Sequence, residues 1–259
     1  MARTIRARAR ECKRGVQGPL ATPHCNDGRA GLGSRMDFRD VTTWIFDLDN
    51  TLYAPEMRLF DQIEARMTAY VMRELGVDAA EANRLRRHYW RQHGTTLSGL
   101  MAEHGIEPMA YLHEVHDIDF SHLTPDPDLA ALIAGLPGRK IVHTNGDVAY
   151  AARVLAGRGL EVFDELHGID TLGFHPKPDP RAYAAVRERS GFEPARAAML
   201  EDDPRNLAIP HQLGMRTILV GDGRQGHDAD LPPAEAQPHV QHRTTDLTGF
   251  LRALALNAG

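Results

Sequence analysis

Cysteine is scarce in this sequence, and the main part of the chain has none. The 259 residues include two cysteines, Cys12 and Cys25. Residues 36–259 therefore cannot form a disulfide or a metal site with thiolate ligands. Because disulfides are rare in a reducing cytoplasm, this absence fits a cytoplasmic protein, and we expect that location.

A second absence concerns long apolar runs. No run approaches the ~20 apolar residues that a membrane-spanning helix needs, so we expect a soluble protein with no membrane partner. Residues 1–35 also lack the apolar segment of a secretory signal peptide. With 42% hydrophobic and 25% charged residues, the chain has a composition typical of a globular protein with one large core and a smaller subdomain.

Positive charge is concentrated in residues 1–35. This segment holds eight Lys and Arg against two acidic residues, a net charge of +6. Because the formal net charge of the whole chain is −5, residues 36–259 carry a net charge of −11. Binding to nucleic acid favours clustered Lys and Arg, so we expect no nucleic-acid polymer as a partner of the acidic body. Because Met36 directly precedes the first predicted strand, we interpret residues 1–35 as a disordered extension or as the result of a wrongly chosen translation start.

The apolar pattern predicts strands that alternate with helices. The predicted strands cover residues 41–46, 140–146, 163–169, 197–200 and 217–220. The helices that alternate with them are predicted over residues 128–136, 147–156, 181–189, 204–213 and 244–256. This order is typical of an α/β fold with a doubly wound parallel sheet.

A purely helical stretch interrupts the alternation after the first strand. Apolar residues recur at helical spacing from Met57 to Leu75, and further helices are predicted over residues 79–92, 97–103 and 109–115. We therefore predict an all-helical cap over residues 54–123. The cap is inserted into an α/β core formed by residues 36–53 and 124–259.

Polar side chains gather where the predicted strands end. They are Asp47 and Asp49 after the first strand, Thr144 and Asn145 after the second, Glu201, Asp202 and Asp203 after the fourth, and Lys177 in a proline-rich loop. In an open parallel sheet, ligands bind beyond the carboxyl ends of the strands. Taken singly, these residues have structural explanations: Lys177 could be a solvated loop lysine, Thr144 could cap the end of a strand, and residues 201–203 could be an acidic cluster at the start of a helix. Their common position at strand ends favours a shared site.

These residue types suit phosphoryl transfer through a covalent aspartyl intermediate. A carboxylate attacks phosphorus, a hydroxyl and an amide hold the phosphoryl oxygens, and a lysine neutralises charge. A second group of carboxylates holds Mg²⁺. Phosphate monoesters hydrolyse so slowly in water that a site must combine several such devices.

The four segments resemble, in order, the four motifs of the haloacid dehalogenase superfamily of phosphohydrolases, over about residues 41–222. The resemblance implies that Asp47 is the nucleophile and a Mg²⁺ ligand. Asp49 would protonate the leaving ester oxygen and later activate water, with its backbone carbonyl on the metal. As an acid near neutrality, Asp49 needs a pKa above the usual value of about 3.9.

The same resemblance implies roles for the remaining segments. Thr144 and the backbone amides of Asn145 and Gly146 would hold the phosphoryl group, and Lys177 would bridge nucleophile and phosphate. Asp202 would complete the Mg²⁺ shell, with Glu201 beside it as a further candidate ligand. The role of Asp203 is left open, because many relatives carry a small residue there.

Two stretches resemble the pyrimidine 5′-nucleotidase family within that superfamily. One is Asp47 to Tyr53, and the other runs from Tyr89 to Leu100 in the predicted cap. The resemblance implies UMP, CMP or their deoxy forms as the substrate. Tyr89 and His93, four residues apart on one helix, could face the base or sugar, or could simply pack the cap. Gly94 would let the backbone approach a ligand.

Several other features receive weaker interpretations. Arg58 and Gln62, near the start of the cap, are further candidates for substrate contact. His143 stands where that family usually has Phe, which we expect to affect packing and not chemistry. His113 and His116 could suggest a transition-metal site with Glu114 and His104, but their spacing favours a solvated cap surface.

The glycine-rich stretch 221–226 matches the G-x-G-x-x-G pattern of dinucleotide-binding proteins. It follows the last predicted strand instead of the first, and Pro232 and Pro233 argue against a helix after it. We therefore expect no dinucleotide site there.

Alternative functions remain open at this point. The protein could act on sugar phosphates or phosphoglycolate, as a phosphatase or a mutase, or it could be a non-catalytic binding protein on the same fold. Asp49 argues against the dehalogenase branch of the superfamily, which lacks the second acid and needs no metal. We expect a monomer or a homodimer that acts on a small-molecule phosphate ester.

Overall fold

The computed structural model describes residues 37–223 and 237–257. The basic segment with its two cysteines lies outside these residues, as do the end of the glycine-rich stretch and the two prolines that follow it. In the described part of the chain, no helix is both long enough and apolar enough to cross a membrane.

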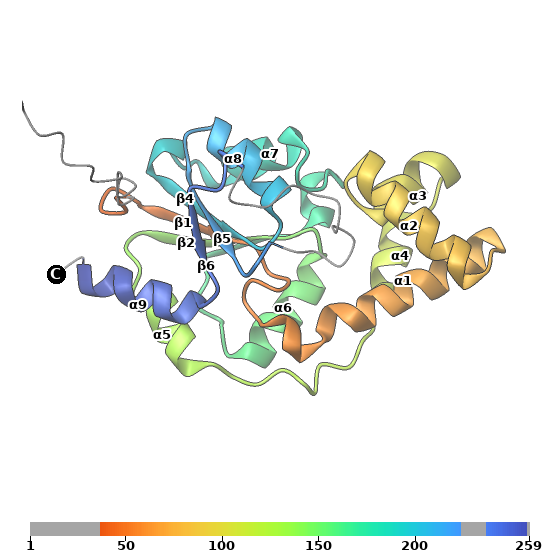
Figure 1. Ribbon diagram of the computed structural model, residues 1–259, viewed down its shortest axis with the longest axis horizontal. Coiled ribbons are helices and arrows are strands. Elements are labelled where there is room, and N and C mark those ends of the chain that lie inside the picture. The colour runs from red at the N-terminus through yellow and green to blue at the C-terminus, as the bar shows by residue number, and fades with distance from the viewer. Residues whose placement is uncertain (1–36, 224–236, 258–259) are drawn as a thin grey trace, which may run out of the picture. The chain divides into compact units, whose positions relative to one another are not determined.

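Six parallel strands form one sheet in the order β3-β2-β1-β4-β5-β6 (Figure 1). The strands are β1 (Thr43–Phe46), β2 (Arg139–His143), β3 (Glu165–His167), β4 (Ala197–Glu201), β5 (Arg216–Val220) and β6 (His242–Thr244). At the carboxyl end of β1, Phe46 is in register with Val142 of β2 and Leu200 of β4. The predicted doubly wound parallel sheet is confirmed.

Helices cover both faces of this sheet. They are α5 (Pro127–Ala134), α6 (Val148–Arg158) and α9 (Leu247–Asn257) on one face, and α7 (Pro180–Ser190) and α8 (Ala208–Gln212) on the other (Figure 1). Side chains of β1 alternate between the two layers, as the pleat of a strand requires. Trp44 and Phe46 pack in the same apolar cluster as α5, α6 and α9, while Ile45 packs with α7.

The end of the chain differs from prediction. The sequence pattern predicts no strand after residue 220 and a helix over residues 244–256. The structure instead places β6 at His242–Thr244 on the edge of the sheet, and α9 begins at Leu247. A partly exposed strand of three residues has too short an apolar pattern to be visible without its partner, β5.

Between β1 and α5, the chain leaves the sheet and forms four α-helices. They are α1 (Leu59–Leu75), α2 (Ala79–His93), α3 (Thr96–His104) and α4 (Pro108–Val115). We refer to these helices as the cap. They share an apolar cluster of their own, and Asp78, Thr95 and Glu107 each cap the start of the following helix with a side-chain oxygen.

The chain passes between core and cap twice, and Arg158 of α6 holds both passages. Its guanidinium donates to the backbone oxygen of Leu52 on the outgoing passage at 3.2 Å. It also donates to the backbone oxygen of Thr124 on the return passage and to Asp126 Oδ2 at 2.8 Å. One buried side chain thus fixes the base of the cap.

We predict that Arg158→Ala lowers the free energy of unfolding by about 2 kcal/mol, because two backbone oxygens and a partly buried carboxylate lose their donor. Urea unfolding measures the loss. The matched control is Arg153→Ala on the same helix, where the side chain is exposed and contacts only the ring of Phe120 among the interactions described. Equal losses in the two variants would contradict a special role for Arg158.

Candidate active site

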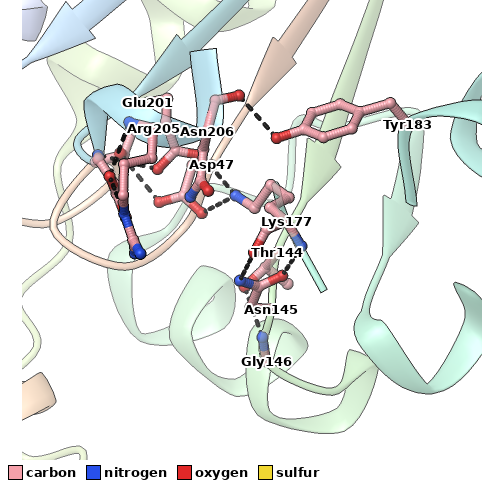
Figure 2. Close-up of polar contacts among 11 residues, drawn as sticks. Asp47, Thr144, Asn145, Gly146, Lys177, Tyr183, Glu201, Arg205 and Asn206 are labelled. Atoms are coloured by element: carbon pink, nitrogen blue, oxygen red, sulfur yellow. Dashed lines mark hydrogen bonds and ion pairs between the residues drawn. The ribbon is translucent and has the colours of Figure 1, made fainter. Parts of the chain in front are cut away.

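The carboxyl ends of three neighbouring strands bring the predicted site residues together. Asp47 follows β1, Thr144 follows β2, and Glu201 ends β4. The backbone N–H of Asp47 donates to the oxygen of Leu200 at 2.9 Å, which extends the pairing of β1 and β4 up to the site. The parallel register therefore places residues that are far apart in the sequence side by side (Figure 2).

Lys177 lies between two carboxylates. Its Nζ is 2.6 Å from Asp47 Oδ1 and 2.7 Å from Glu201 Oε2, and only 1% of the residue is exposed (Figure 2). Burial alone would lower the pKa of this amine, but the charges and hydrogen bonds of Asp47 and Glu201 raise it above its usual value. Lys177 is therefore a permanent positive charge beside Asp47.

The second oxygen of Asp47 is also held, since the Thr51 hydroxyl donates to Oδ2 at 3.1 Å. Asn145 supports Lys177 from behind. Its side-chain oxygen accepts from the backbone N–H of Lys177 at 2.7 Å, and its Nδ2 donates to the backbone oxygen of Lys177 at 3.2 Å. The Asn145 side chain thus fixes the loop that carries Lys177, which we call the lysine loop. Only the backbone of Asn145 is then left for contact with a ligand.

Three carboxylates gather at one point. Oxygens of Asp47, Glu201 and Asp202 all lie within 4.8 Å of one another. Burial and the charge of Asp47 raise the pKa of Glu201 to about 7, and burial with the charges of Asp47 and Glu201 raises the pKa of Asp202 well above its usual value. Three such groups beside one ammonium favour the uptake of further positive charge.

This donor set fits a magnesium ion. Mg²⁺ prefers oxygen ligands and binds through one or two carboxylates. Among the described residues, Asp47, Glu201 and Asp202 form the one group of His, Cys, Asp and Glu side chains close enough to hold a metal ion. Lys177 donates to both Asp47 and Glu201, so these two carboxylates are held at the centre of the group that Asp202 completes.

Asp49 lies beyond Leu48, whose side chain is fully buried in the core. The hydroxyls of Tyr53 and Tyr150 both donate to Asp49 Oδ1, at 2.7 and 2.6 Å. These bonds lower the pKa of Asp49, but burial and the charge of Asp47 outweigh them and raise it. The raised pKa is what a general acid near neutrality requires.

The loop after β2 is tightly packed. Thr144 is buried, and its hydroxyl accepts from the backbone N–H of Gly146 at 3.0 Å. Asn145 and Gly146 line the cleft, whereas Thr144 does not. Position 146 requires glycine, because a Cβ there would lie 2.8 Å from Cδ1 of Tyr150.

A cleft of about 820 Å³ connects these residues with the cap. Its walls include Asp47, Asp49, Lys177 and Asp202 from the core and Trp90 from the cap. Most sites for small molecules have volumes of roughly 300–1,000 Å³. Gly221, Asp222 and Gly223 of the glycine-rich stretch also line the cleft, while the rest of that stretch lies outside the described residues.

Asp203 has a structural partner that the sequence did not indicate. Its carboxylate accepts from Arg205 Nη2 at 2.6 Å, and the Arg205 guanidinium lies over the Trp90 ring, 3.2 Å from the ring centroid. The acidic loop of the core and helix α2 of the cap therefore meet through a cation–π contact. Trp90 lies in the stretch from Tyr89 to Leu100, but nothing in the sequence pairs it with Arg205, so only the fold reveals the contact.

Tyr89 and His93 do not face the cleft, which corrects the expectation that they contact the substrate. Tyr89 is 1% exposed, and its hydroxyl is hydrogen-bonded to His104 Nε2 at 2.7 Å within the cap. Its ring lies on Gly99, where a Cβ would come within 2.3 Å of Tyr89 Cγ. His93 Nε2 is 2.9 Å from Glu103 Oε1. The packing alternative accounts for both side chains.

Gly94 lines the cleft, but the group that approaches its backbone closely is the loop of Pro176 and Lys177 and not a ligand. Gly94 has a φ of +86°, and a Cβ there would lie 3.3 Å from Pro176 Cγ and 3.5 Å from the backbone oxygen of Lys177. The absent side chain lets α2 end directly against the lysine loop. Gly94 thus joins the cap to the loop that positions Lys177.

The other cap candidates also find protein partners. Gln62 exchanges two hydrogen bonds of 3.0 Å with the backbone of Asp119, and exposed Arg58 donates to Asp61 at 2.8 Å. Neither of them lines the cleft. His116 is buried against Asp147, so the expectation of a solvated surface is wrong for this residue, whereas His113 is exposed as expected.

A family model, one curated relative and several solved structures match this chain. The family model for haloacid dehalogenase-like hydrolases matches residues 41–214. Phosphate metabolism protein 8 of Saccharomyces cerevisiae is 25% identical over 193 residues, an alignment that covers 68% of this chain but only 60% of that protein.

Two solved structures illustrate the likeness in fold. A predicted phosphoglycolate phosphatase from Haemophilus somnus 129PT is 16% identical with a TM-score of 0.57, and the match covers 83% of this chain and 98% of that one. The L-2-haloacid dehalogenase PA0810 is 19% identical with a TM-score of 0.51, covering 83% and 99%. Both identities are low, so these likenesses concern the fold alone.

We predict that Mg²⁺ stabilises the wild-type protein and not the variant Asp202→Asn. Saturating Mg²⁺ should raise the thermal midpoint by about 5 °C, because an ion that binds only the folded state stabilises it. Without Mg²⁺, Asp202→Asn should melt no lower than wild type, since it removes a repelled carboxylate. Thermal melts with and without Mg²⁺ measure both effects.

The matched control for this experiment is Asp128→Asn, which changes an exposed carboxylate. It should keep the full response to Mg²⁺. A response in Asp202→Asn as large as that of wild type would show that the metal binds elsewhere.

Proposed function

The chain belongs to the haloacid dehalogenase-like hydrolases, and from this premise we propose that it is a Mg²⁺-dependent phosphomonoester hydrolase. The observation that carries the proposal is the pairing of two differently held carboxylates in one cleft. Asp47 is fixed by Lys177, while Asp49 is fixed by two phenol hydroxyls and has a raised pKa. A nucleophile and an acid have these opposite requirements.

The first chemical step follows from these positions. A carboxylate oxygen of Asp47 forms a bond to phosphorus, and the bond between phosphorus and the ester oxygen breaks. Asp49 gives its proton to that ester oxygen, so the alcohol leaves neutral. Lys177 stays protonated and stabilises the negative charge that gathers beside Asp47. The product of this step is an aspartyl phosphate on Asp47.

The second step restores the enzyme. Asp49, now ionised, takes a proton from water, and the water oxygen bonds to phosphorus as the bond to Asp47 breaks. Inorganic phosphate leaves, and both carboxylates return to their starting states. Asn145 and Gly146 line the cleft where the phosphoryl oxygens would lie, and their backbone amides are the proposed donors to those oxygens. The Gly146 amide now donates to the Thr144 hydroxyl and would have to exchange this partner for the phosphoryl group.

Asp47 and Asp202 would hold the magnesium ion, with Glu201 beside them and the backbone oxygen of Asp49 as a further ligand. When bound, Mg²⁺ supplies positive charge that offsets the repulsion between an anionic nucleophile and an anionic ester. The raised pKa values of Glu201 and Asp202 support this assignment, because a cation would relieve their mutual repulsion.

We propose pyrimidine nucleoside 5′-monophosphates, UMP or CMP, as the substrates. The support is the resemblance of residues 47–53 and 89–100 to pyrimidine 5′-nucleotidases, together with a cleft large enough for a nucleotide. Sugar phosphates and phosphoglycolate are the competing substrates of the same reaction. Dehalogenation is less well supported, because a second acid and a buried acidic cluster serve phosphoryl transfer and not halide displacement.

The substrate class is tested with a panel of phosphate esters in Mg²⁺ and in a chelator. We expect kcat/KM for UMP and CMP to exceed the values for ribose 5-phosphate and phosphoglycolate by at least ~10-fold, and we expect the chelator to abolish all turnover. Equal or better turnover of the sugar phosphates would replace the nucleotidase assignment with theirs.

The nucleophile is tested separately with Asp47→Asn. This variant keeps the shape of the side chain but should lower kcat by at least ~10⁴-fold on every ester, because an amide cannot form the acyl phosphate. The control Asp40→Asn changes an exposed residue before the start of β1 and should leave kcat unchanged. Substantial turnover by Asp47→Asn would rule out the covalent mechanism.

A further inference from the structure

His116 ties the end of the cap to the core beside the active site. It directly follows α4, is 8% exposed, and has its Nδ1 2.6 Å from Asp147 Oδ2. Asp147 directly follows the loop of Asn145 and Gly146 and caps α6, since its Oδ1 accepts from the backbone N–H of Tyr150 at 2.8 Å. One buried carboxylate thus links a cap residue to the helix that carries Tyr150.

The His116 ring also lies directly on the ring of Tyr150. The two ring centroids are 4.2 Å apart, and the planes are inclined by 15°. The Tyr150 ring further packs against Gly146, which has no side chain that would displace it. The position of the Tyr150 ring therefore depends on a residue of the cap as well as on the core.

The Tyr150 hydroxyl reaches Asp49. Together with the hydroxyl of Tyr53 it occupies Asp49 Oδ1, at 2.6 and 2.7 Å. Burial and the charge of Asp49 raise the pKa of both phenols well above the usual value, so each keeps its proton and donates it. A carboxylate oxygen has about two lone-pair sites, and both sites of Oδ1 accept a hydrogen bond from a tyrosine. The proton that Asp49 transfers is therefore carried by Oδ2.

We infer that Tyr150 and His116 are positioning residues for the general acid, with His116 coupling the orientation of Asp49 to the docking of the cap. This inference rests on the proposed function. During the first step the proton passes from Asp49 Oδ2 to the leaving ester oxygen, while Tyr150 keeps its own proton and holds Oδ1. Because His116 directly follows α4, a displacement of the cap that took His116 off the Tyr150 ring would remove a constraint on the orientation of Asp49.

The test compares two kinds of leaving group. An alkyl ester such as UMP expels a poor leaving group and needs the proton of Asp49, whereas p-nitrophenyl phosphate expels a stable phenolate and needs it little. The ratio kcat/KM covers the reaction up to the first irreversible step, so it reports this proton transfer. A residue that only supports folding would lower kcat/KM for the two esters equally.

Tyr150→Phe removes a single oxygen and keeps the ring. We expect it to lower kcat/KM for the alkyl ester roughly 10- to 100-fold, but for p-nitrophenyl phosphate by less than about 3-fold. His116→Ala should show the same selectivity with a loss of roughly 10-fold. His116→Asn, whose amide can still donate to Asp147, should recover part of it.

The matched control is His113→Ala, which changes an exposed residue of α4 three positions before His116 and should leave both ratios unchanged. Equal losses on the two esters, or full activity of Tyr150→Phe on the alkyl ester, would overturn the inference while leaving the proposed function intact. A wild-type protein that hydrolyses neither ester would overturn the proposed function, and the inference with it.

Discussion

The ion pairs of Lys177 make the acidic centre possible. Buried carboxylates are costly unless a cation lies beside them, and Lys177 lies within 2.7 Å of two of them, Asp47 and Glu201. The sheet register brings the two carboxylates together, and Asn145 holds the lysine loop against them. Because Asp47 follows β1 and Glu201 ends β4, Lys177 can compensate both charges only once these two strands have paired. Structure and chemistry therefore depend on the same few contacts.

The cap contacts this centre at points that matter for reactivity. Gly94 lies against the lysine loop, Trp90 against Arg205, and His116 against Asp147 and Tyr150. Through these contacts the cap touches the loop of the cationic residue, the acidic loop and the support of the general acid. Arg158 meanwhile fixes both passages between cap and core. The cap thus contacts the residues that hold the candidate site in place.

The sequence predicts the parts of this arrangement that depend on local pattern. Strand ends and helix periods indicated the parallel sheet and the group around Asp47, because such signals lie within a few residues. Tyr150 was not found, since its distance from Asp49 depends on how α6 packs. For Tyr89 and His93 the sequence leaves substrate contact and packing open, because spacing on a helix shows that two side chains share a face but not where that face points. His116 was taken as surface for the same reason, and β6 was missed because three residues form a strand only beside β5.

A crystal structure with Mg²⁺ and beryllium trifluoride, a mimic of an acyl phosphate, tests the central claim most directly. We predict that beryllium is bonded to an oxygen of Asp47 within reach of Lys177, with Mg²⁺ coordinated by Asp47 and Asp202. Beryllium on any other residue, or Mg²⁺ bound away from this acidic group, would contradict the account.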